Sequence, residues 1–540
     1  MAKGFLARLS SDTRANVMAI VAASMVPLIG MVGGGFDLSR MYIVKTRLQH
    51  ACDAGALAGR KAMGGGTWTQ QSNTPRAEAI RFFEANIADN AYGAQQMTKN
   101  FTENAGKVTG TASAVLPMTL MRVFGETQST LTVRCDAEMR LPNTDVMFVL
   151  DVTLSMASKA VSSDPDTKIA SLRTAVKCFY EIVARLDTPA TCVGGAPSGG
   201  TGNQVQIRFG FVPYNMNVNV GRLLPTSYFN DRWTYQSRRA VRTGNQQFSH
   251  WVYEAVEHPI AGLKNGAGWN ASLQLPLGRN GTNRTIAWDG CIEERQTVSG
   301  TNFNPIPSGA IDLDIDRVPN SSDSRWGPSL RDVIYTRDAN NAYTRNPVTT
   351  SAELRSYHNY FCPTESRKLQ SWTNPANFSS YVDTLQPNGN TYHDIGLLWA
   401  ARLMSPTGIF GSENALTPAG GEIERHMIFM TDGDTSTNNI NYSAYGVPWY
   451  DRRNVANPGN VGNNFNAEVN ARFSALCLAV RNKNITLWVI SFGNGSNSAT
   501  ETRLSQCATP GRYFVARNSA ALQQTFKSIA DQISALRLTE

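Results

Sequence analysis

The chain has 540 residues, of which 41% are hydrophobic, and its formal net charge is +8 at pH 7. This length allows two or three domains, and the hydrophobic content is typical of a globular protein and excludes a disordered chain. Because the basic residues are dispersed and no nucleic-acid-binding motif accompanies them, we interpret the charge as a solvated basic surface and expect no nucleic-acid partner.

An uncharged segment lies near the N-terminus, at residues 16–35. As a helix it spans about 30 Å, which matches the hydrocarbon core of a bilayer. The segment is preceded by the basic residues Lys3, Arg8 and Arg14. Basic residues also follow it, but large downstream domains are translocated largely regardless of charge. We therefore predict a single-pass membrane protein with a cytoplasmic N-terminus at 1–15.

The alternative to a retained membrane anchor is a cleaved signal peptide. No small-x-small cleavage site followed by a turn is present, and apolar residues keep a roughly helical spacing from Phe36 to Ala58. We therefore favour a retained transmembrane helix. Within it, Gly30 and Gly34 either pack against another membrane helix or mark a loosely wound helix end.

Residues 36–142 combine the continuation of this helix with a small α+β stem. A helix is predicted from Pro75 to Asn90. The period-two alternation of apolar residues at 107–115 and 129–135 predicts half-buried strands.

From residue 143 to residue 540 the pattern becomes that of an α/β domain. Strands are predicted at 145–150, 205–213, 426–431 and 485–492, and helices at 168–186, 466–483 and 519–536. Strands that alternate with amphipathic helices indicate a doubly wound, mostly parallel sheet. Such sheets bind ligands beyond the carboxyl ends of their strands.

An insertion at 221–380 interrupts this domain. It is rich in Asn, Gly, Ser and Thr, but it also contains six tryptophans, which favour an ordered structure over a linker. Asp312, Asp314 and Asp316 alternate within it, as in a calcium loop. The Gly and the terminal Glu of an EF-hand are absent, so we interpret these residues as part of an exposed edge strand.

A cation-binding pattern follows the first strand of the α/β domain. Asp151, Thr153 and Ser155 form an Asp-x-Thr-x-Ser run directly after an apolar strand. One carboxylate and two hydroxyls supply several oxygen ligands and a single negative charge, which suits Mg²⁺. Two further segments offer oxygens: Thr391 lies in a Gly/Asn-rich loop before an apolar helix, and Asp432 ends another strand.

These three segments, in this order, resemble the metal-ion-dependent adhesion site of von Willebrand factor A (vWA) domains. The resemblance implies that Asp151, Thr153, Ser155 and Thr391 bind Mg²⁺ (or Mn²⁺ or Ca²⁺), with Asp432 acting directly or through water. An Asp or Glu carboxylate of a protein partner would complete the coordination. Thr153 departs from the family, which usually has Ser there. The acids Asp394 and Asp434 are candidates for a supporting role around the ligands.

The N-terminal part of the chain, from Ala7 to Met63, resembles the start of TadG-like proteins of the Tad/Flp pilus system. Phe36-Asp37-Leu-Ser-Arg40 and the Ala-rich run after Leu48 carry this resemblance. It implies a bacterial inner-membrane protein with a periplasmic vWA domain that acts in pilus assembly or pilus-linked adhesion.

Three other functions are compatible with the same sequence. The protein could be a surface adhesin for external ligands, a vWA scaffold without metal, or an enzyme. The enzyme hypothesis has little support, because no His-Glu-x-x-His, Gly-x-Ser-x-Gly, Walker A or dinucleotide-binding motif is present. We therefore expect no catalytic residues. The sequence does not predict the oligomeric state.

Eight cysteines occur without a Cys-x-x-Cys pair, which argues against zinc. An exported chain permits disulfides. From their positions the plausible pairs are Cys178 with Cys192, Cys291 with Cys362, and Cys477 with Cys507. The alternative is buried free thiols.

Overall fold

The computed structural model divides the chain into two compact units, Met1–Leu141 and Pro142–Glu540. It describes residues 13–63, 68–104, 107–138, 143–185, 207–339, 342–354, 356, 359–416 and 423–536. The sequence predicts the end of the stem at residue 142.

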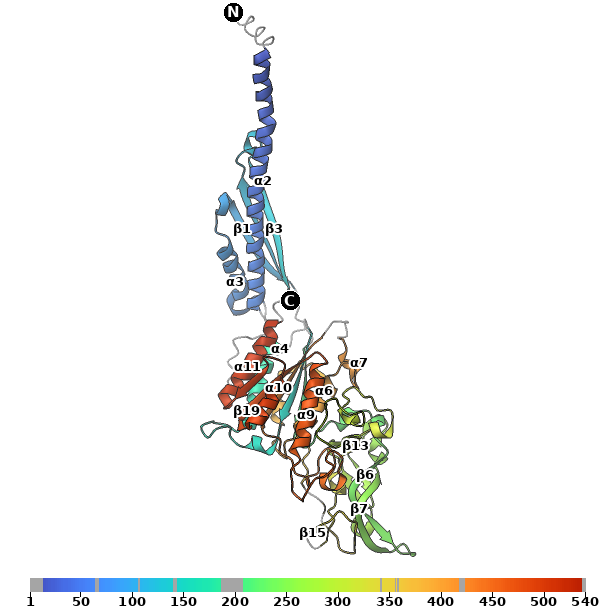
Figure 1. The fold of residues 1–540 in the computed structure, drawn as a ribbon. Coiled ribbons are helices and arrows are strands. Elements are labelled where there is room, and N and C mark those ends of the chain that lie inside the picture. The colour runs from blue at the N-terminus through green and yellow to red at the C-terminus, as the bar shows by residue number, and fades with distance from the viewer. Residues whose placement is uncertain are drawn as a thin grey trace, which may run out of the picture. The chain divides into compact units, whose positions relative to one another are not determined.

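The first unit is a long helix packed on a small antiparallel sheet (Figure 1). Its elements are α2 (Thr13–Met63), α3 (Gln70–Asn86), β1 (Gln95–Asn104), β2 (Lys107–Pro117) and β3 (Gln128–Glu138), with short 3-10 turns η1 (Ala91–Gly93) and η2 (Met121–Phe124). The second half of α2 buries Val44, Leu48 and Ala51 in the core of this unit, where Cys52 forms a disulfide with Cys135. The predicted helix and both predicted strands of the stem are confirmed.

The first half of α2 contains the predicted membrane segment. The helix is long and apolar enough to cross a membrane. Its large apolar side chains between Ile20 and Val32 are exposed, whereas Val44 and Leu48 farther along the helix are fully buried. The helix continues without interruption from Thr13 to Met63, which confirms that it extends beyond the apolar segment.

The second unit contains a six-stranded sheet in the order β17-β5-β4-β18-β19-β20. The strands are β4 (Asn143–Asp151), β5 (Ile207–Tyr214), β17 (Arg367–Gln370), β18 (Ile423–Gly433), β19 (Ile485–Gly495) and β20 (Tyr513–Ala516). All neighbours are parallel except β17, which pairs antiparallel with the edge of β5. The mixed α/β class and the mostly parallel sheet agree with the prediction.

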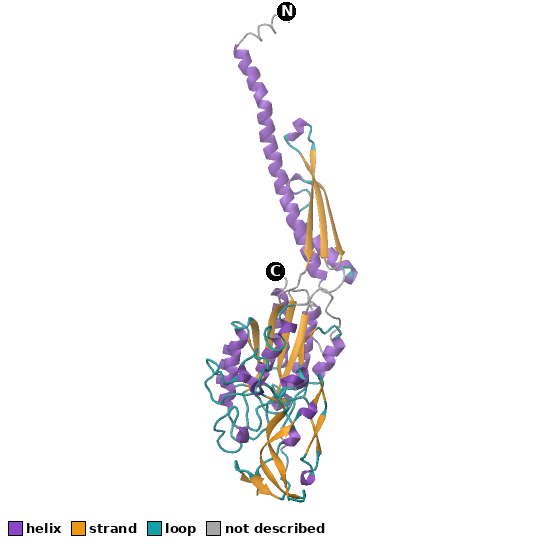
Figure 2. Ribbon diagram, turned by 90° about the vertical axis from the view of Figure 1, so that its right-hand side faces the viewer, coloured by secondary structure: helices purple, strands orange, loops and turns teal. Residues whose placement is uncertain are grey.

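Helices cover both faces of this sheet (Figure 2). The helices are α4 (Lys168–Arg185), α5 (Pro375–Asp383), α6 (His393–Met404), α7 (Gly411–Asn414), α8 (Pro448–Asp451), α9 (Asn466–Arg481), α10 (Ser498–Cys507) and α11 (Ser519–Leu536). Successive residues of β4 point to opposite faces, so Val146 and Phe148 pack with α4, α5 and α11, whereas Met147 and Val149 share a core with α6 and α9.

The insertion is an ordered set of strands, most of them short, that shares the core of α6 and α9. The strands are β6 (Arg232–Arg242), β7 (Phe248–Pro259), β8 (Lys264–Asn265), β9 (Gly268–Trp269), β10 (Ser272–Leu275), β11 (Arg284–Ala287), β12 (Ile292–Glu293), β13 (Gly327–Pro328), β14 (Asp338–Ala339), β15 (Ala342–Tyr343) and β16 (Val348–Thr350). Trp251, Trp288 and Trp326 are buried in the shared core. The predicted range 221–380 is too long at its end, because β17 and the start of α5 belong to the sheet and its cover.

The predicted edge strand at Asp312, Asp314 and Asp316 is wrong. Residues Ile311–Leu313 form a 3-10 turn, and the Asp312 side chain is fully buried against the guanidinium of Arg472. A buried ion-pair partner from a distant helix, and not the local alternation, decides the conformation.

Disulfides link Cys291 to Cys362 and Cys477 to Cys507, which are two of the pairs proposed from the sequence. Cys192, the proposed partner of Cys178, lies outside the described residues.

Candidate metal centre

The carboxyl ends of β4 and β18 bring two acids together. These strands are parallel neighbours with Leu150 opposite Met430, so Asp151 and Asp432 leave the sheet at the same edge. The Thr153 hydroxyl lies 2.9 Å from the Ser155 hydroxyl, which donates to Asp432 Oδ1 at 2.7 Å. Asp151 Oδ1 accepts from the Thr153 amide at 2.9 Å. Four of the five predicted ligands therefore form one cluster.

The fifth predicted ligand, Thr391, is brought beside this loop by backbone hydrogen bonds. The Asn388 amide donates to the Val152 carbonyl at 2.8 Å, and the Leu154 amide donates to the Gly389 carbonyl at 3.1 Å. Gly389 has φ +78°, a conformation that glycine adopts without strain. Among the described residues, none is hydrogen-bonded to the Thr391 hydroxyl, so this oxygen is available as a ligand.

Lys168, at the start of α4, contacts the cluster and was not predicted. Its Nζ donates to Asp432 Oδ2 at 2.8 Å and to the Ser155 carbonyl at 3.4 Å, and its side chain is 9% exposed. One oxygen of Asp432 is thus paired with an ammonium group. A lysine that opens a helix is usually solvated, so nothing in the sequence around Lys168 singles it out as part of the site.

The cluster has an excess of buried negative charge. Burial and the negative charge of Asp432 raise the pKa of Asp151 to about 7. Two hydrogen bonds to Asp151 lower its pKa but offset the rise only in part. One comes from the Thr153 amide, and the other comes from the Thr431 hydroxyl, which lies 2.8 Å from Asp151 Oδ2. A cation at this position would stabilise the ionised carboxylate.

His393 contacts the cluster indirectly, through the Thr431 hydroxyl. Its Nε2 lies 2.9 Å from the Thr431 hydroxyl and its Nδ1 lies 3.0 Å from the Thr435 hydroxyl. Because Thr431 gives its only hydroxyl proton to Asp151, Nε2 is the donor in this contact. Burial, with a smaller effect from the positive charge of Arg503, lowers the pKa of His393 to about 3, so the ring is neutral.

The two acids proposed for a supporting role have other partners. Asp394 accepts from Arg472 Nε at 2.9 Å and from the Ile395 amide at 2.9 Å. Asp434 Oδ1 accepts from the backbone amide of Asn497, the N-cap of α10, at 2.9 Å. Both lie next to the cluster in sequence, and both have hydrogen bonds with elements outside it.

The residues present fit a hard cation. Every side-chain atom proposed here as a metal ligand is an oxygen, and hydroxyls and carboxylates are the ligands that Mg²⁺ and Ca²⁺ prefer. A second group of candidate ligand atoms, in Asp289, Cys291 and Cys362, lies within 4.8 Å. Its two sulfurs are joined in a disulfide, so they cannot act as thiolate ligands.

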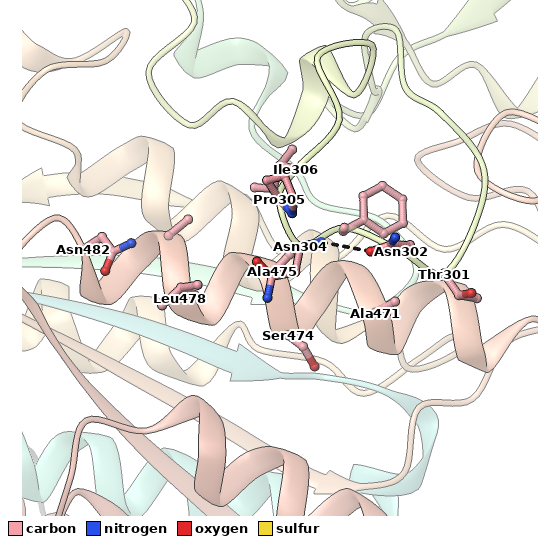
Figure 3. Close-up of a pocket in the computed structure, with 12 residues that line it drawn as sticks. Thr301, Asn302, Asn304, Pro305, Ile306, Ala471, Ser474, Ala475, Leu478 and Asn482 are labelled. Carbon is pink, nitrogen blue, oxygen red and sulfur yellow. Dashed lines mark hydrogen bonds between the residues drawn. The ribbon is translucent and has the colours of Figure 1, made fainter.

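A surface groove of about 470 Å³ lies elsewhere in this unit, between α9 and the loop 301–306 (Figure 3). Ala471, Ala475 and Leu478 form its helical wall, and the Asn304 amide donates to Asn302 Oδ1 at 3.4 Å in the loop. No acid or base lines it, so the groove offers no cation ligand set comparable to the cluster at the strand ends.

Solved structures to which the chain is similar include the vWF domain of the type V pili tip protein Mfa5 from Porphyromonas gingivalis. It is 11% identical, with a TM-score of 0.31, covering 73% of this chain and 96% of that one. The pilus adhesin SpaC from Lactobacillus rhamnosus GG is also 11% identical, with a TM-score of 0.31, over 81% of this chain. The match spans only 34% of the length of SpaC.

Proximal thread matrix protein 1 from the mussel byssus, with a zinc-occupied MIDAS motif, is 12% identical, with a TM-score of 0.27, over 74% of this chain and 49% of that one. No curated protein matches the chain. Residues 16–64 match the Tad family model, described as putative Flp pilus-assembly TadE/G-like. This match confirms, for the N-terminal segment, the resemblance to Tad/Flp pilus proteins that the sequence predicts.

Proposed function

We propose that this protein is a membrane-anchored, metal-dependent protein-binding component of Tad/Flp pilus assembly or pilus-linked adhesion. The observation that carries the proposal is the oxygen cluster of Asp151, Thr153, Ser155 and Asp432. Backbone hydrogen bonds hold the loop that contains Thr391 beside this cluster. The order of the sheet, which runs outward in both directions from β4, supports a doubly wound vWA fold. The Tad match at residues 16–64 supports the pilus context.

In this proposal Asp151, Thr153, Ser155 and Thr391 hold Mg²⁺, and Asp432 acts directly or through water. The ion, when bound, offers a coordination position to an Asp or Glu carboxylate of a protein partner. Asp151 and Thr153 are almost fully buried, whereas Ser155 is exposed and the neighbouring Leu154 is 63% exposed. A partner can therefore reach the cation beside Ser155 and cover the Leu154 side chain as it does so.

The apolar half of α2 is proposed to cross the bacterial inner membrane at residues 16–35. Residues 1–15 would then be cytoplasmic and the second unit periplasmic. Disulfides within the second unit support this placement, because they persist in oxidising compartments such as the periplasm.

Binding of the purified full-length protein to pili sheared from the producing bacterium tests this function. We expect binding in Mg²⁺ and severalfold weaker binding in EDTA or after Asp151→Asn. Asp434→Asn is the matched control, because it removes an equivalent charge from an acid that is bonded to Asn497. Binding that is insensitive both to EDTA and to Asp151→Asn would contradict the proposal. Binding only to external surfaces would favour the adhesin alternative.

A further inference from the structure

The loop between β2 and β3 presents apolar side chains at its tip. This loop contains η2 (Met121–Phe124), in which Val123 is 75% exposed and Phe124 is 44% exposed. Val123 and Phe124 are neighbours in the chain, so this turn carries a small exposed apolar surface. The tip, defined here as residues 119–125, also carries the exposed Arg122.

The tip is fixed against α2 by the carboxylate of Asp37, which is 2% exposed. Asp37 accepts hydrogen bonds from three successive backbone amides of the tip, those of Thr119 at 3.0 Å, Leu120 at 2.9 Å and Met121 at 2.8 Å. Burial works to raise the pKa of Asp37, but these amides together lower it below its usual value. The carboxylate is thus held ionised, and the tip has a defined position on the helix.

Glycines of α2 make room for this contact. A Cβ atom on Gly33 would lie 2.8 Å from Leu120 Cβ, and one on Gly30 would lie 3.3 Å from Phe124 Cζ. A Cβ on Gly34 would lie 3.8 Å from Met121 Sδ. The glycines therefore accept the tip within the same unit, and the helix is continuous through them, so it is not loosely wound at this point.

The contact places the tip beside the last turns of the apolar segment. Gly30 lies about 7 Å before the end of the segment at residue 35, because a helix rises 1.5 Å per residue. Apolar side chains of interfacial elements are buried about 5–10 Å into the boundary between headgroups and acyl chains. Phe124, at the level of Gly30, falls within this range, and Arg122 is long enough to reach the lipid phosphates.

We propose that the tip is a second membrane-contacting element. It inserts Val123 and Phe124 into the leaflet that contains the C-terminal end of the apolar segment. The inference rests on the proposal that α2 spans the membrane. Its partner is the lipid bilayer, since the exposed side chains continue the exposed apolar surface of α2. The polar side chains that α2 itself places against the tip, Asp37 and Arg40, lie beyond the end of the apolar segment. The tip would fix the depth and rotation of α2 in the bilayer.

The test uses the full-length protein in vesicles of phosphatidylcholine and phosphatidylglycerol. No cysteine is free in the part of the chain that the structure describes. A single thiol introduced by Val123→Cys can therefore carry an environment-sensitive fluorophore. Ile29→Cys, at a 47% exposed position of α2, reports the anchor. Asn104→Cys, at the opposite end of the sheet, is the water-exposed control.

We expect a lipid spin-labelled near the glycerol end of its acyl chain to quench the Val123 label severalfold more than the Asn104 label. Quenching at Ile29 but not at Val123 would overturn this inference and leave the anchor intact. Loss of quenching at both would overturn the inference together with the anchor. Protection of the Val123 label from both the lipid quencher and aqueous iodide would overturn it in favour of a protein partner at the tip.

Discussion

Asp151→Asn should make the metal-free protein more stable at neutral and higher pH. The raised pKa of Asp151, about 7 against an ordinary 3.8, means that the native state holds this proton more tightly than the unfolded chain. The free energy of unfolding therefore falls as the pH rises from about 4 to about 7, by at most about 4 kcal/mol from this group. Asparagine is uncharged, retains the acceptor for the Thr153 amide and does not incur this cost.

Mg²⁺ should reduce the difference in the free energy of unfolding between the wild type and Asp151→Asn. Binding to the native state at about 100 times Kd stabilises it by about 2.7 kcal/mol. The wild type should gain this amount and the variant should gain nothing, because its carboxylate ligand is missing. The same substitution is thus expected to raise metal-free stability and to abolish stabilisation by metal, a combination that damage to the fold would not produce.

Urea denaturation followed by tryptophan fluorescence measures both effects in the full-length protein. All tryptophans except Trp68 lie in the second unit, so the signal reports mainly on the domain that carries the site. Measurements at about pH 5 and about pH 8, in EDTA and in Mg²⁺, separate the titration from metal binding. Equal stability of the two metal-free proteins at about pH 8 would refute the buried-charge reasoning, and equal stabilisation of both by Mg²⁺ would refute the ligand assignment.

Two further substitutions test the surroundings of the site. Lys168→Met should bind Mg²⁺ at least about tenfold more tightly in calorimetric titration, because the substitution removes the ammonium group that is paired with the Asp432 carboxylate. Lys159→Met, an exposed position on the same loop, is the control for net charge and should leave the affinity unchanged. Arg472→Met should lower the free energy of unfolding by about 3–5 kcal/mol, because it leaves buried carboxylates unpaired. Arg239→Met, in an exposed ion pair, should cost less than about 1 kcal/mol. Equal losses of unfolding free energy in Arg472→Met and Arg239→Met would contradict the expectation that a buried ion pair costs more to break than an exposed one.

The sequence predicts the central strands and the main helices well because their patterns are local. The strand 485–492 is apolar on both faces, as a strand covered by helices on each side must be, and it forms most of β19. The strand β17 could not be predicted in this way. Its four residues, Arg367–Gln370, become a strand only because β5 offers an unpaired edge, and that edge is more than 150 positions away in the sequence.

The candidate site shows the same division between local and distant information. Asp151, Thr153 and Ser155 are recognised from their spacing, since one loop carries all three. Lys168 could not be recognised, because its role depends on where the start of α4 lies relative to Asp432. The disulfide between Cys52 and Cys135 likewise depends on how α2 packs on β3.

The long gap between Asp151 and Thr391 is compatible with one site because the insertion is bonded to α6, the helix that follows Thr391. In the first turn of α6, Asp394 pairs with Arg472, which also binds Asp312 of the insertion. At the other end of α6, Arg402 pairs with Glu294 of the insertion at 2.8 Å, and both side chains are fully buried. Unpairing such groups is strongly unfavourable. The insertion therefore fixes the helix that positions Thr391, and substitutions that loosen this buried network should weaken metal binding as well as the fold.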